Sequence, residues 1–367
     1  MDDRILFVSH SADWIGPTHS LLLLLKSLRH DFDVAVLLPR RGRFSEELER
    51  LEVPVFTMPS LTKWTLPSVT RLVGRGRFDL VYANNTGSVS RIAFTAAALN
   101  RVPFICHVRE MRWNATWRQL WYFRLADAVI AVSRACADSV SRFVRRGRLH
   151  VVYNGVDLGE FVPGQDTVGL RTELGIPADA LLLMSIAHVC ERKGQVHAVT
   201  ALAEIVQAYP SAHLCLVGSL TRQPTYVDRV RQLAEESGIS DHVHLPGFRS
   251  DVPRLLQETD IFVHTSTRDP HPRAAIEAMA AGLPVVSFAA DGIAETVVEG
   301  ETGRLVPLED TESLVEAVLE LANCPDARTR MGAAGRKRVE SHFSCEETAA
   351  RVRDIVTEVI LGGSARS

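Results

Sequence analysis

Residues 261–290, IFVHTSTRDPHPRAAIEAMAAGLPVVSFAA, contain a strand, a helix and a second strand in immediate succession. The apolar run at 261–266 is typical of a buried strand, Gly282 and Pro284 end the helix, and the second strand begins at Val285. A helix that joins two apolar strands favours a parallel sheet covered by helices. The stretch therefore predicts an α/β fold whose ligands bind at the carboxyl ends of the strands.

Two carboxylates lie at that expected ligand-binding edge. Asp269 belongs to the loop that leaves the first strand, and Glu277 follows eight residues later inside the helix. The helix opens near Pro272, Arg273 and Ala274, and the N–H groups at a helix N-terminus attract anions. A carboxylate in the helix can hold ribose hydroxyls, and one in the loop can hold sugar hydroxyls. This pattern predicts a nucleotide-sugar pocket, although a surface loop before an ordinary amphipathic helix is the alternative.

The same alternation of strand and helix covers most of the chain. Residues 159–172 interrupt it, which predicts a linker, and an amphipathic helix is expected at about 345–361. We therefore expect two Rossmann-like domains, at 1–162 and 163–343, followed by a C-terminal helix at 344–361. Strands are expected at 4–10, 33–39, 54–58, 79–85, 103–110, 128–133 and 149–155, then at 181–188, 213–219 and 243–248, with early helices at 20–29 and 44–51.

The composition is that of a soluble globular protein with two domains, because 46% of 367 residues are hydrophobic and 23% are charged. Apolar runs stay shorter than the ~20 residues that a membrane span needs. The N-terminus is acidic and enters a strand at once, unlike a signal peptide. The six cysteines form no CxxC pair and no cluster with metal-ligand spacing. We expect a cytoplasmic protein with reduced cysteines and without a metal.

The charge is unevenly distributed along the chain. Up to Gln165 there are 22 Lys and Arg against 15 Asp and Glu, whereas the remainder has 19 against 29. A basic first half fits an anionic partner, such as a phosphorylated acceptor or the inner face of the membrane; a chance imbalance is the alternative. A helix would align Trp113, Trp117 and Trp121 on one face, either toward a membrane or acceptor or toward the core. We expect no nucleic-acid partner.

The spacing of Asp269 and Glu277, with the following EAMA-x-G-x-P-V-V at 277–286, resembles the E-x7-E motif of GT4-type retaining glycosyltransferases (glycosyl transferases group 1). Here Asp replaces the first Glu of that motif. The resemblance implies the GT-B fold, in which two Rossmann-like domains face each other across a cleft and a C-terminal helix crosses back to the first domain. It also implies a nucleotide diphosphate sugar as the donor.

Further segments resemble the family in the expected second domain. Lys193 and Gly194 match its K-G pair, which holds the donor diphosphate, while His188 stands where an Arg is usual. Phe248 and Arg249 match a segment whose backbone meets the nucleoside. Asp291 replaces the first glycine of a GG-x-x-E motif.

Two segments of the first half also resemble the family. Gly16-Pro17 replaces a glycine pair after the first strand, and proline lacks an N–H, so this loop offers phosphate one donor fewer. CHVRE at 106–110 resembles an H-x-R-E segment in which the histidine approaches the donor sugar. A lone histidine at a strand end is otherwise a structural residue, but the matching second-domain motif favours the site role for His107.

The resemblance therefore implies a retaining glycosyltransferase that uses front-side attack, in which the departing diphosphate helps take the acceptor proton, and the lack of metal-ligand spacing in the sequence predicts that it works without a metal. An epimerase on the same fold and a catalytically silent sugar-nucleotide-binding protein are the alternatives. The acceptor is open among a glycan, a lipid-linked sugar and a small natural product, and no cofactor beyond the donor is expected. The predicted catalytic residues are His107, Lys193 and Asp269, and the predicted donor-binding residues are Gly16, His188, Phe248, Arg249, Pro272, Arg273, Ala274 and Glu277.

Overall fold

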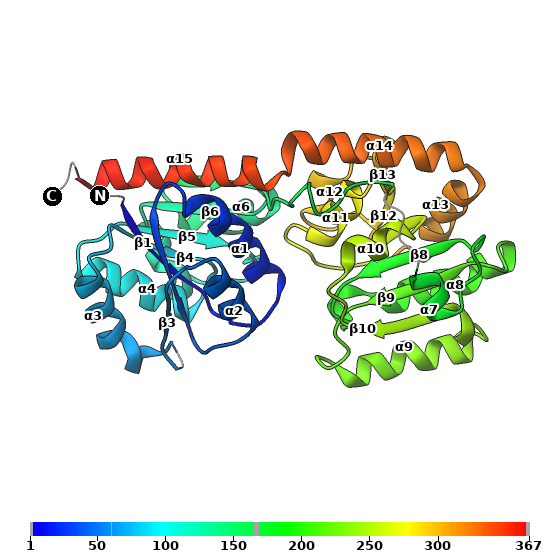
Figure 1. Cartoon of the computed structure of the whole chain (residues 1–367), viewed down its shortest axis with the longest axis horizontal. Helices are drawn as coiled ribbons and strands as arrows, with labels where there is room; N and C mark the ends of the chain where they lie inside the picture. The colour runs from blue at the N-terminus through cyan, green and yellow to red at the C-terminus, as the bar shows by residue number, and fades with distance from the viewer. Residues whose placement is uncertain (1–2, 60, 165–168, 365–367) are drawn as a thin grey trace. The chain divides into compact units, whose positions relative to one another are not determined.

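The computed structural model describes residues 3–59, 61–164 and 169–364 (Figure 1). The chain divides into two compact units. Unit 1 runs to Val156 and resumes at Phe343, and unit 2 is Asp157–His342. The first division falls six residues before the boundary expected at 162, and the second falls one residue before the boundary expected at 343.

Unit 1 contains a seven-stranded parallel sheet in the order β3-β2-β1-β4-β5-β6-β7. Its central strands are almost wholly buried, as the apolar runs predicted, because helices cover both faces. The strand order reverses around β1, which lies between β2 and β4, and such a reversal places ligands at the carboxyl ends of these strands. The strands are β1 (Arg4–Val8), β2 (Asp33–Leu38), β3 (Val55–Thr57), β4 (Leu80–Ala83), β5 (Phe104–Val108), β6 (Ala128–Ala131) and β7 (Leu149–Val151).

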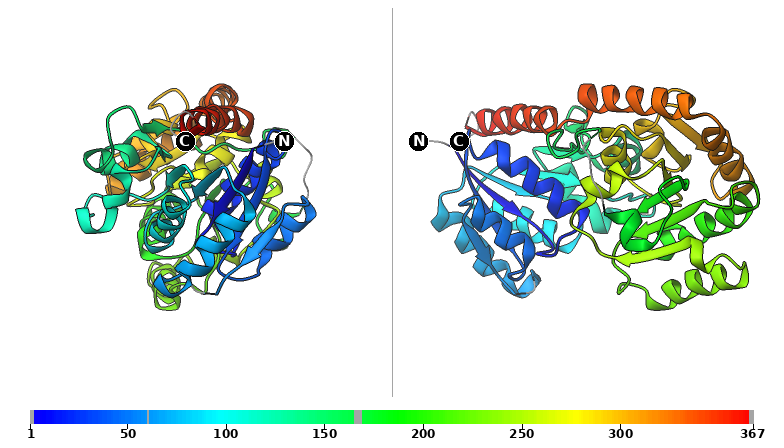
Figure 2. Two further views of the ribbon diagram at one scale, coloured as in Figure 1. Left: turned by 90° about the vertical axis from the view of Figure 1, so that its left-hand side faces the viewer. Right: turned by 45° about the vertical axis from the view of Figure 1, so that its right-hand side comes forward.

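Helices divide between the two faces of this sheet. One core includes α1 (Gly16–Leu28), α2 (Arg43–Arg50) and the C-terminal helix α15 (Cys345–Ser364). Figure 2 shows α15 (red) beside α1 (blue), and Val352 and Val356 of α15 are fully buried there. The other core includes α3 (Leu66–Gly76), α4 (Ser88–Leu99), α5 (Trp117–Leu120) and α6 (Arg134–Val140), with the 3-10 helices η1 (Lys63–Thr65), η2 (Trp121–Arg124) and η3 (Ser141–Phe143) in the same unit.

Unit 2 contains a six-stranded parallel sheet in the order β10-β9-β8-β11-β12-β13. The order reverses at β8, so the loops after β8 and β11 start side by side. The strands are β8 (Leu182–Ile186), β9 (His213–Val217), β10 (Val243–Gly247), β11 (Ile261–His264), β12 (Val285–Phe288) and β13 (Gly303–Val306). The helices are α7 (Leu170–Leu174), η4 (Glu191–Lys193), α8 (Gln195–Ala208), α9 (Pro224–Glu236), η5 (Ser240–His242), α10 (Val252–Gln257), α11 (Arg273–Ala280), α12 (Ile293–Thr296), α13 (Thr311–Asn323) and α14 (Pro325–His342).

Some local expectations were wrong. Helix α1 begins at Gly16 rather than at residue 20, because proline at position 17 suits the first turn of a helix and Thr18 Oγ1 accepts the Ile15 N–H at 3.0 Å. Helix α7 begins inside the stretch expected as a linker, of which residues 165–168 lie outside the described part. In the part of the chain that the structure describes, each helix is too short or too polar to cross a membrane.

The tryptophan segment also differs from its prediction. Trp117 and Trp121 begin the short helices α5 and η2, whereas Trp113 lies in the preceding turn, so no single helix aligns all three. Their exposed fractions are 53% for Trp113, 48% for Trp117 and 42% for Trp121. These side chains are therefore not members of the core.

Candidate functional site

In unit 2 the loops that follow β8 and β11 bring Lys193 and Asp269 together. The Lys193 ammonium donates a hydrogen bond to Asp269 Oδ2, and each side chain is only about an eighth exposed, at 13% and 12%. The loops touch closely, because a Cβ on Gly194 would lie 2.2 Å from the Thr265 carbonyl oxygen. Gly194 has a positive φ of 62°, which glycine adopts without strain. Two of the three predicted catalytic residues thus form one buried ion pair.

The charge state of this pair follows from its surroundings. Burial pushes the pKa of Asp269 upward, but the Lys193 ammonium and His264 outweigh burial and hold it below its ordinary value. His264 Nε2 lies 3.6 Å from Asp269 Oδ2. Burial lowers the pKa of His264 to about 4, despite the opposing effect of Asp269, so this imidazole is neutral at pH 7. The pair therefore consists of one carboxylate and one ammonium beside a neutral imidazole. His264, the last residue of β11, was missed in the sequence because it stands inside an apolar run.

Helix α11 starts four residues after Asp269. Pro272 is its N-cap residue, and Arg273 and Ala274 form its first turn, as expected. Arg273 Nη2 donates to Glu277 Oε1 at 2.9 Å, one helical turn along, and both side chains are 10% exposed. Burial raises the pKa of Glu277 above its ordinary value, while Arg273 acts in the opposite direction. Glu277 thus already has a cationic partner, which the sequence did not predict.

Asp291 is a third carboxylate next to the Asp269 loop. The Asp269 N–H donates to Asp291 Oδ2 at 3.1 Å, and the Gly292 N–H returns a bond of 3.1 Å to the Asp269 carbonyl. Asp291 has a φ of +50°, a left-handed conformation that aspartate tolerates better than most residues. Burial raises the pKa of Asp291. The resemblance marked Asp291 only as a replaced glycine, yet its side chain holds the loop that carries Asp269.

The other predicted donor-binding residues follow β8 and β10. His188 is half-buried, and its pKa is lowered by burial and by nearby Arg222 and Lys193, so it adds no positive charge. Phe248 is 50% exposed. Arg249 forms ion pairs with Glu173 at 2.6 Å and Asp251 at 2.7 Å, so its guanidinium has carboxylate partners. The expected nucleoside contact of these two residues through their backbone stays a prediction.

In unit 1 the first residues of α1 are tied to the end of β4. Asn84, which follows β4, donates from Nδ2 to the Pro17 carbonyl oxygen at 3.0 Å. A Cβ on Gly16 would meet no atom within 4 Å, so packing in the described structure does not require glycine there. The phosphate contact expected of Gly16 stays a prediction.

His107 lies in β5 and is buried among polar groups. Its Nδ1 is 2.7 Å from the Tyr82 hydroxyl and 3.3 Å from Arg109 Nη2. Arg109 also donates from Nε to Asn84 Oδ1 and from Nη1 to Asn154 Oδ1, each at 2.8 Å. Burial and the Arg109 charge hold the pKa of His107 well below its usual range, so the ring is neutral. Sequence reasoning missed Tyr82 because it lies within the apolar β4.

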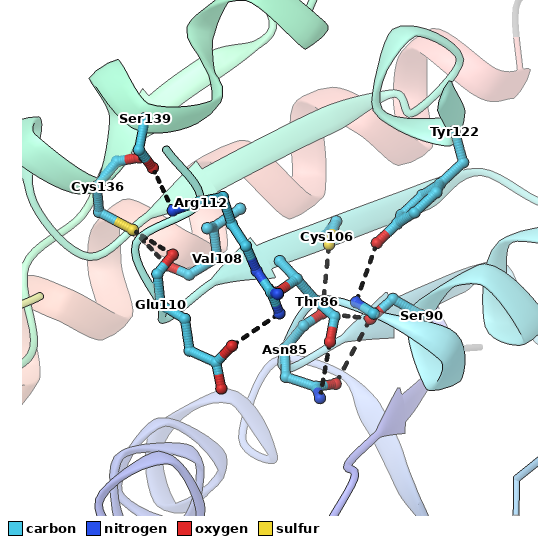
Figure 3. Close-up of polar contacts among 11 residues, drawn as sticks. Asn85, Thr86, Ser90, Cys106, Val108, Glu110, Arg112, Tyr122, Cys136 and Ser139 are labelled. Carbon is cyan, nitrogen blue, oxygen red and sulfur yellow. Dashed lines mark hydrogen bonds and ion pairs between the residues drawn. The ribbon is translucent and has the colours of Figure 1, made fainter. Parts of the chain in front are cut away.

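The loops after β4 and β5 are joined by a second polar network (Figure 3). Arg112 donates from Nε to Thr86 Oγ1 at 2.7 Å and from Nη2 to Glu110 Oε2 at 2.7 Å. The Asn85 carbonyl oxygen accepts from Ser90 and from the Cys106 thiol. These bonds fix the loops around the buried Arg109. Over residues 3–59, 61–164 and 169–364 there is no group of three His, Cys, Asp or Glu residues that could hold a metal ion.

Comparison with known proteins identifies the family and the fold of the chain. The model of "Glycosyl transferases group 1" matches residues 169–338, and that of "Glycosyltransferase Family 4" matches residues 16–160. The chain belongs to the group 1 glycosyltransferase family. The crystal structure of Anabaena HepE in complex with UDP and glucose is similar to 97% of this group 1 chain and 100% of HepE, with a TM-score of 0.88 and 25% identity. The predicted GT-B fold is therefore confirmed.

Two curated relatives of this group 1 chain show how far the similarity extends. The lipopolysaccharide core biosynthesis glycosyltransferase LpsE of Rhizobium meliloti is 29% identical over 62% of the chain, which spans 63% of LpsE and thus less than two thirds of it. A GDP-mannose-dependent monoacylated phosphatidylinositol monomannoside mannosyltransferase of Corynebacterium glutamicum is 27% identical over 80% of both chains.

Proposed function

We propose that this protein is a retaining glycosyltransferase that moves a sugar from a nucleotide diphosphate sugar to an acceptor hydroxyl. The observation that carries the proposal is the buried Lys193–Asp269 pair next to the start of α11. An ammonium and a helix N-terminus at the carboxyl edge of a parallel sheet are suited to a diphosphate. Structures of HepE with UDP and with UDP-glucose support a uridine nucleotide as the first donor to test.

The charge of each site residue suggests which part of the donor it would contact. Lys193 and the first N–H groups of α11 would stabilise the departing diphosphate, Glu277 would hold the ribose, and Asp269 and His107 would contact the sugar. In front-side attack the acceptor oxygen bonds to the anomeric carbon as its bond to the diphosphate oxygen breaks. The acceptor proton then passes to the departing diphosphate, and the anomeric configuration is retained.

The reaction would not require a metal, because the protein itself supplies positive charge. The Arg192 charge helps to lower the pKa of Asp269, and Arg192 Nη1 donates to the Arg268 carbonyl at 2.8 Å, while the Arg268 charge acts on the neighbouring Asp291. Turnover is expected to survive EDTA. Complete loss of turnover in chelator, restored by Mg²⁺ or Mn²⁺, would contradict metal independence.

The proposal is tested by ligand binding followed by turnover. A thermal-shift panel of UDP-, GDP-, ADP- and dTDP-sugars identifies the donor, since a ligand that binds only the folded state raises the melting temperature. The selected donor is then incubated with candidate acceptors, and NMR gives the anomeric configuration of the product. Transfer with inversion would contradict retention. Donor binding without hydrolysis or transfer, across glycan, lipid-linked and small-molecule acceptors, would favour the silent binding protein.

We also propose that unit 1 contacts an anionic membrane surface, because aromatic and basic side chains are exposed together there. Trp117 packs edge-on against Phe143, and the neighbouring Arg142 donates to the Ala115 carbonyl at 2.8 Å, so the tryptophan segment and η3 are adjacent. Residues 112–148 contain eight arginines and two aspartates. The aromatic-basic surface consists of Trp113, Trp117, Trp121, Leu125, Arg118, Arg124, Arg142, Arg145 and Arg146, all of them exposed.

Vesicle sedimentation tests this contact. The protein is expected to bind vesicles that contain phosphatidylglycerol, to ignore pure phosphatidylcholine, and to be released by salt as the Debye length falls to ~8 Å at physiological ionic strength. Arg145→Glu with Arg146→Glu should abolish binding. The matched reversal of Arg330 and Lys337, exposed on α14, should leave it intact. No sedimentation at low salt, or equal loss in both double variants, would contradict the proposal.

A further inference from the structure

The hydrogen bonds around His107 determine which ring nitrogen carries the proton. Arg109 Nη2, 3.3 Å from Nδ1, can only donate, because a guanidinium has no acceptor. Nδ1 must therefore present its lone pair toward Arg109. The Tyr82 hydroxyl, 2.7 Å from the same nitrogen, then acts as a second donor to it. Both contacts require an unprotonated Nδ1.

The proton of the neutral ring accordingly resides on Nε2. The Nε2 atom is buried and has no hydrogen-bond partner among the described residues. A buried N–H without a partner loses its hydrogen bonds to water with no compensation, so native proteins rarely leave one without a ligand or water. His107 is thus a neutral donor at the penultimate position of β5, two residues before Arg109.

We propose that Tyr82, together with Arg109, locks His107 as the Nε2–H tautomer, so that its free N–H donates to an oxygen of the bound substrate. The identity of that oxygen as a hydroxyl of the donor sugar rests on the proposed function. In this role His107 is neither a general acid nor a general base, because its proton-accepting nitrogen is occupied by two donors. Tyr82 is a positioning residue that acts through His107.

The position of Tyr82 suits this task. Its side chain is fully buried in β4, and its ring packs at 4.8 Å from that of Phe7. β4 and β5 are neighbouring strands, and Tyr82 lies opposite Ile105. The Tyr82 hydroxyl therefore reaches His107, which is two residues beyond Ile105 on β5. A buried tyrosine hydroxyl needs a hydrogen-bond partner, and His107 Nδ1 provides it. Burial also raises the pKa of Tyr82, which keeps its proton available to donate.

The tautomer is read directly by long-range ¹H–¹⁵N correlation spectra of protein labelled in its histidines. The His107 signals are assigned by their loss in His107→Gln. The wild type should show the neutral Nε2–H pattern at pH 7. Tyr82→Phe should move the pattern toward a mixture of tautomers. Tyr122→Phe removes another buried hydroxyl of unit 1, which accepts from the Gly87 N–H, and should leave the His107 signals unchanged.

Kinetics with the selected donor sugar give a second, separate readout. A glutamine amide nitrogen can take the place of Nε2, whereas that of asparagine takes the place of Nδ1. His107→Gln should therefore keep about tenfold more kcat/KM than His107→Asn, roughly the value of one hydrogen bond. Tyr82→Phe should lower kcat/KM while its melting temperature stays close to that of Tyr122→Phe.

Several results would overturn the proposal. These are an Nδ1–H pattern or an imidazolium in the wild type, an unchanged pattern in Tyr82→Phe, or equal activity of the Gln and Asn variants. The spectra need neither a donor nor turnover. Failure of the glycosyltransferase function would therefore be seen separately from failure of the tautomer.

Discussion

The candidate site residues of the two units are held by different kinds of interaction. In unit 2 they form two buried ion pairs, Lys193–Asp269 and Arg273–Glu277. In unit 1 a buried arginine, Arg109, is hydrogen-bonded to two neutral amide oxygens and lies near the neutral ring of His107. On the proposed function, the charged groups of unit 2 would exchange partners when the donor binds, whereas Arg109 of unit 1 donates to two neutral amide oxygens.

This difference has an energetic consequence. Removing one member of a buried ion pair leaves an uncompensated charge, which is more costly than the loss of one hydrogen bond to a neutral partner. A diphosphate that replaces Asp269 as the partner of Lys193 keeps the ammonium compensated. The ion pairs of unit 2 would therefore hold the side chains in position before the donor binds, and the donor could then replace one partner of each pair.

The largest effect is expected from Lys193→Ala. The leaving diphosphate gains charge as its bond breaks, so kcat should fall by about 10²–10³-fold while donor affinity changes less. Steady-state kinetics measure both, with Lys337→Ala on the exposed surface of α14 as the control. A rise in KM at constant kcat would show that Lys193 binds the ground state and transition state equally.

A smaller effect is expected from Glu277→Gln. Loss of a charge-assisted hydrogen bond to ribose should weaken donor binding by about 1.5–3 kcal/mol, measured by calorimetry. Burial already disfavours the Glu277 carboxylate in the folded state, so the neutral amide should not lower the melting temperature. Unchanged donor affinity would exclude the ribose role, whatever the stability.

Asn84→Ala tests the neutral network of unit 1. It removes an acceptor of Arg109 and the bond to the Pro17 carbonyl, and should lower the free energy of unfolding by about 1–2 kcal/mol in chemical denaturation. Lys193→Ala measured in the same way should be more destabilising. The reverse order would show that the contrast between the units is wrong.

The smallest effect concerns pH. The folded-state pKa of Glu277 is raised, so the folded protein binds a proton before the unfolded chain does as pH falls toward 4.5. The stability of the wild type relative to Glu277→Gln should therefore increase as pH falls from 7 toward 4.5. Donor affinity should decrease over the same range, because protonation removes the charge that holds ribose. A pH-independent difference in melting temperature would refute this assignment.

The sequence predicted the sheets because local patterns specify them. Apolar runs separated by amphipathic helices occur at β1, β8 and β11, and they require parallel strands with helices on both faces. The edge at which Asp269 and Glu277 lie follows from the same rule, since both come after the carboxyl end of a strand. The backbone of residue 194 also has a positive φ, a conformation that the glycine in the sequence adopts without strain.

Tertiary structure decided which side chains meet. Lys193 and Asp269 are 76 residues apart, and they pair because β8 lies beside β11, an order that no local pattern specifies. Tyr82 and His107 meet because β4 and β5 are neighbours, although Tyr82 looked like one more apolar strand residue. The exposure of the tryptophans likewise depends on two short helical turns in place of one helix. The periodicity of apolar residues determines whether a segment forms a helix or a strand. The partners, charge states and tautomers of its side chains depend on elements that are distant in sequence.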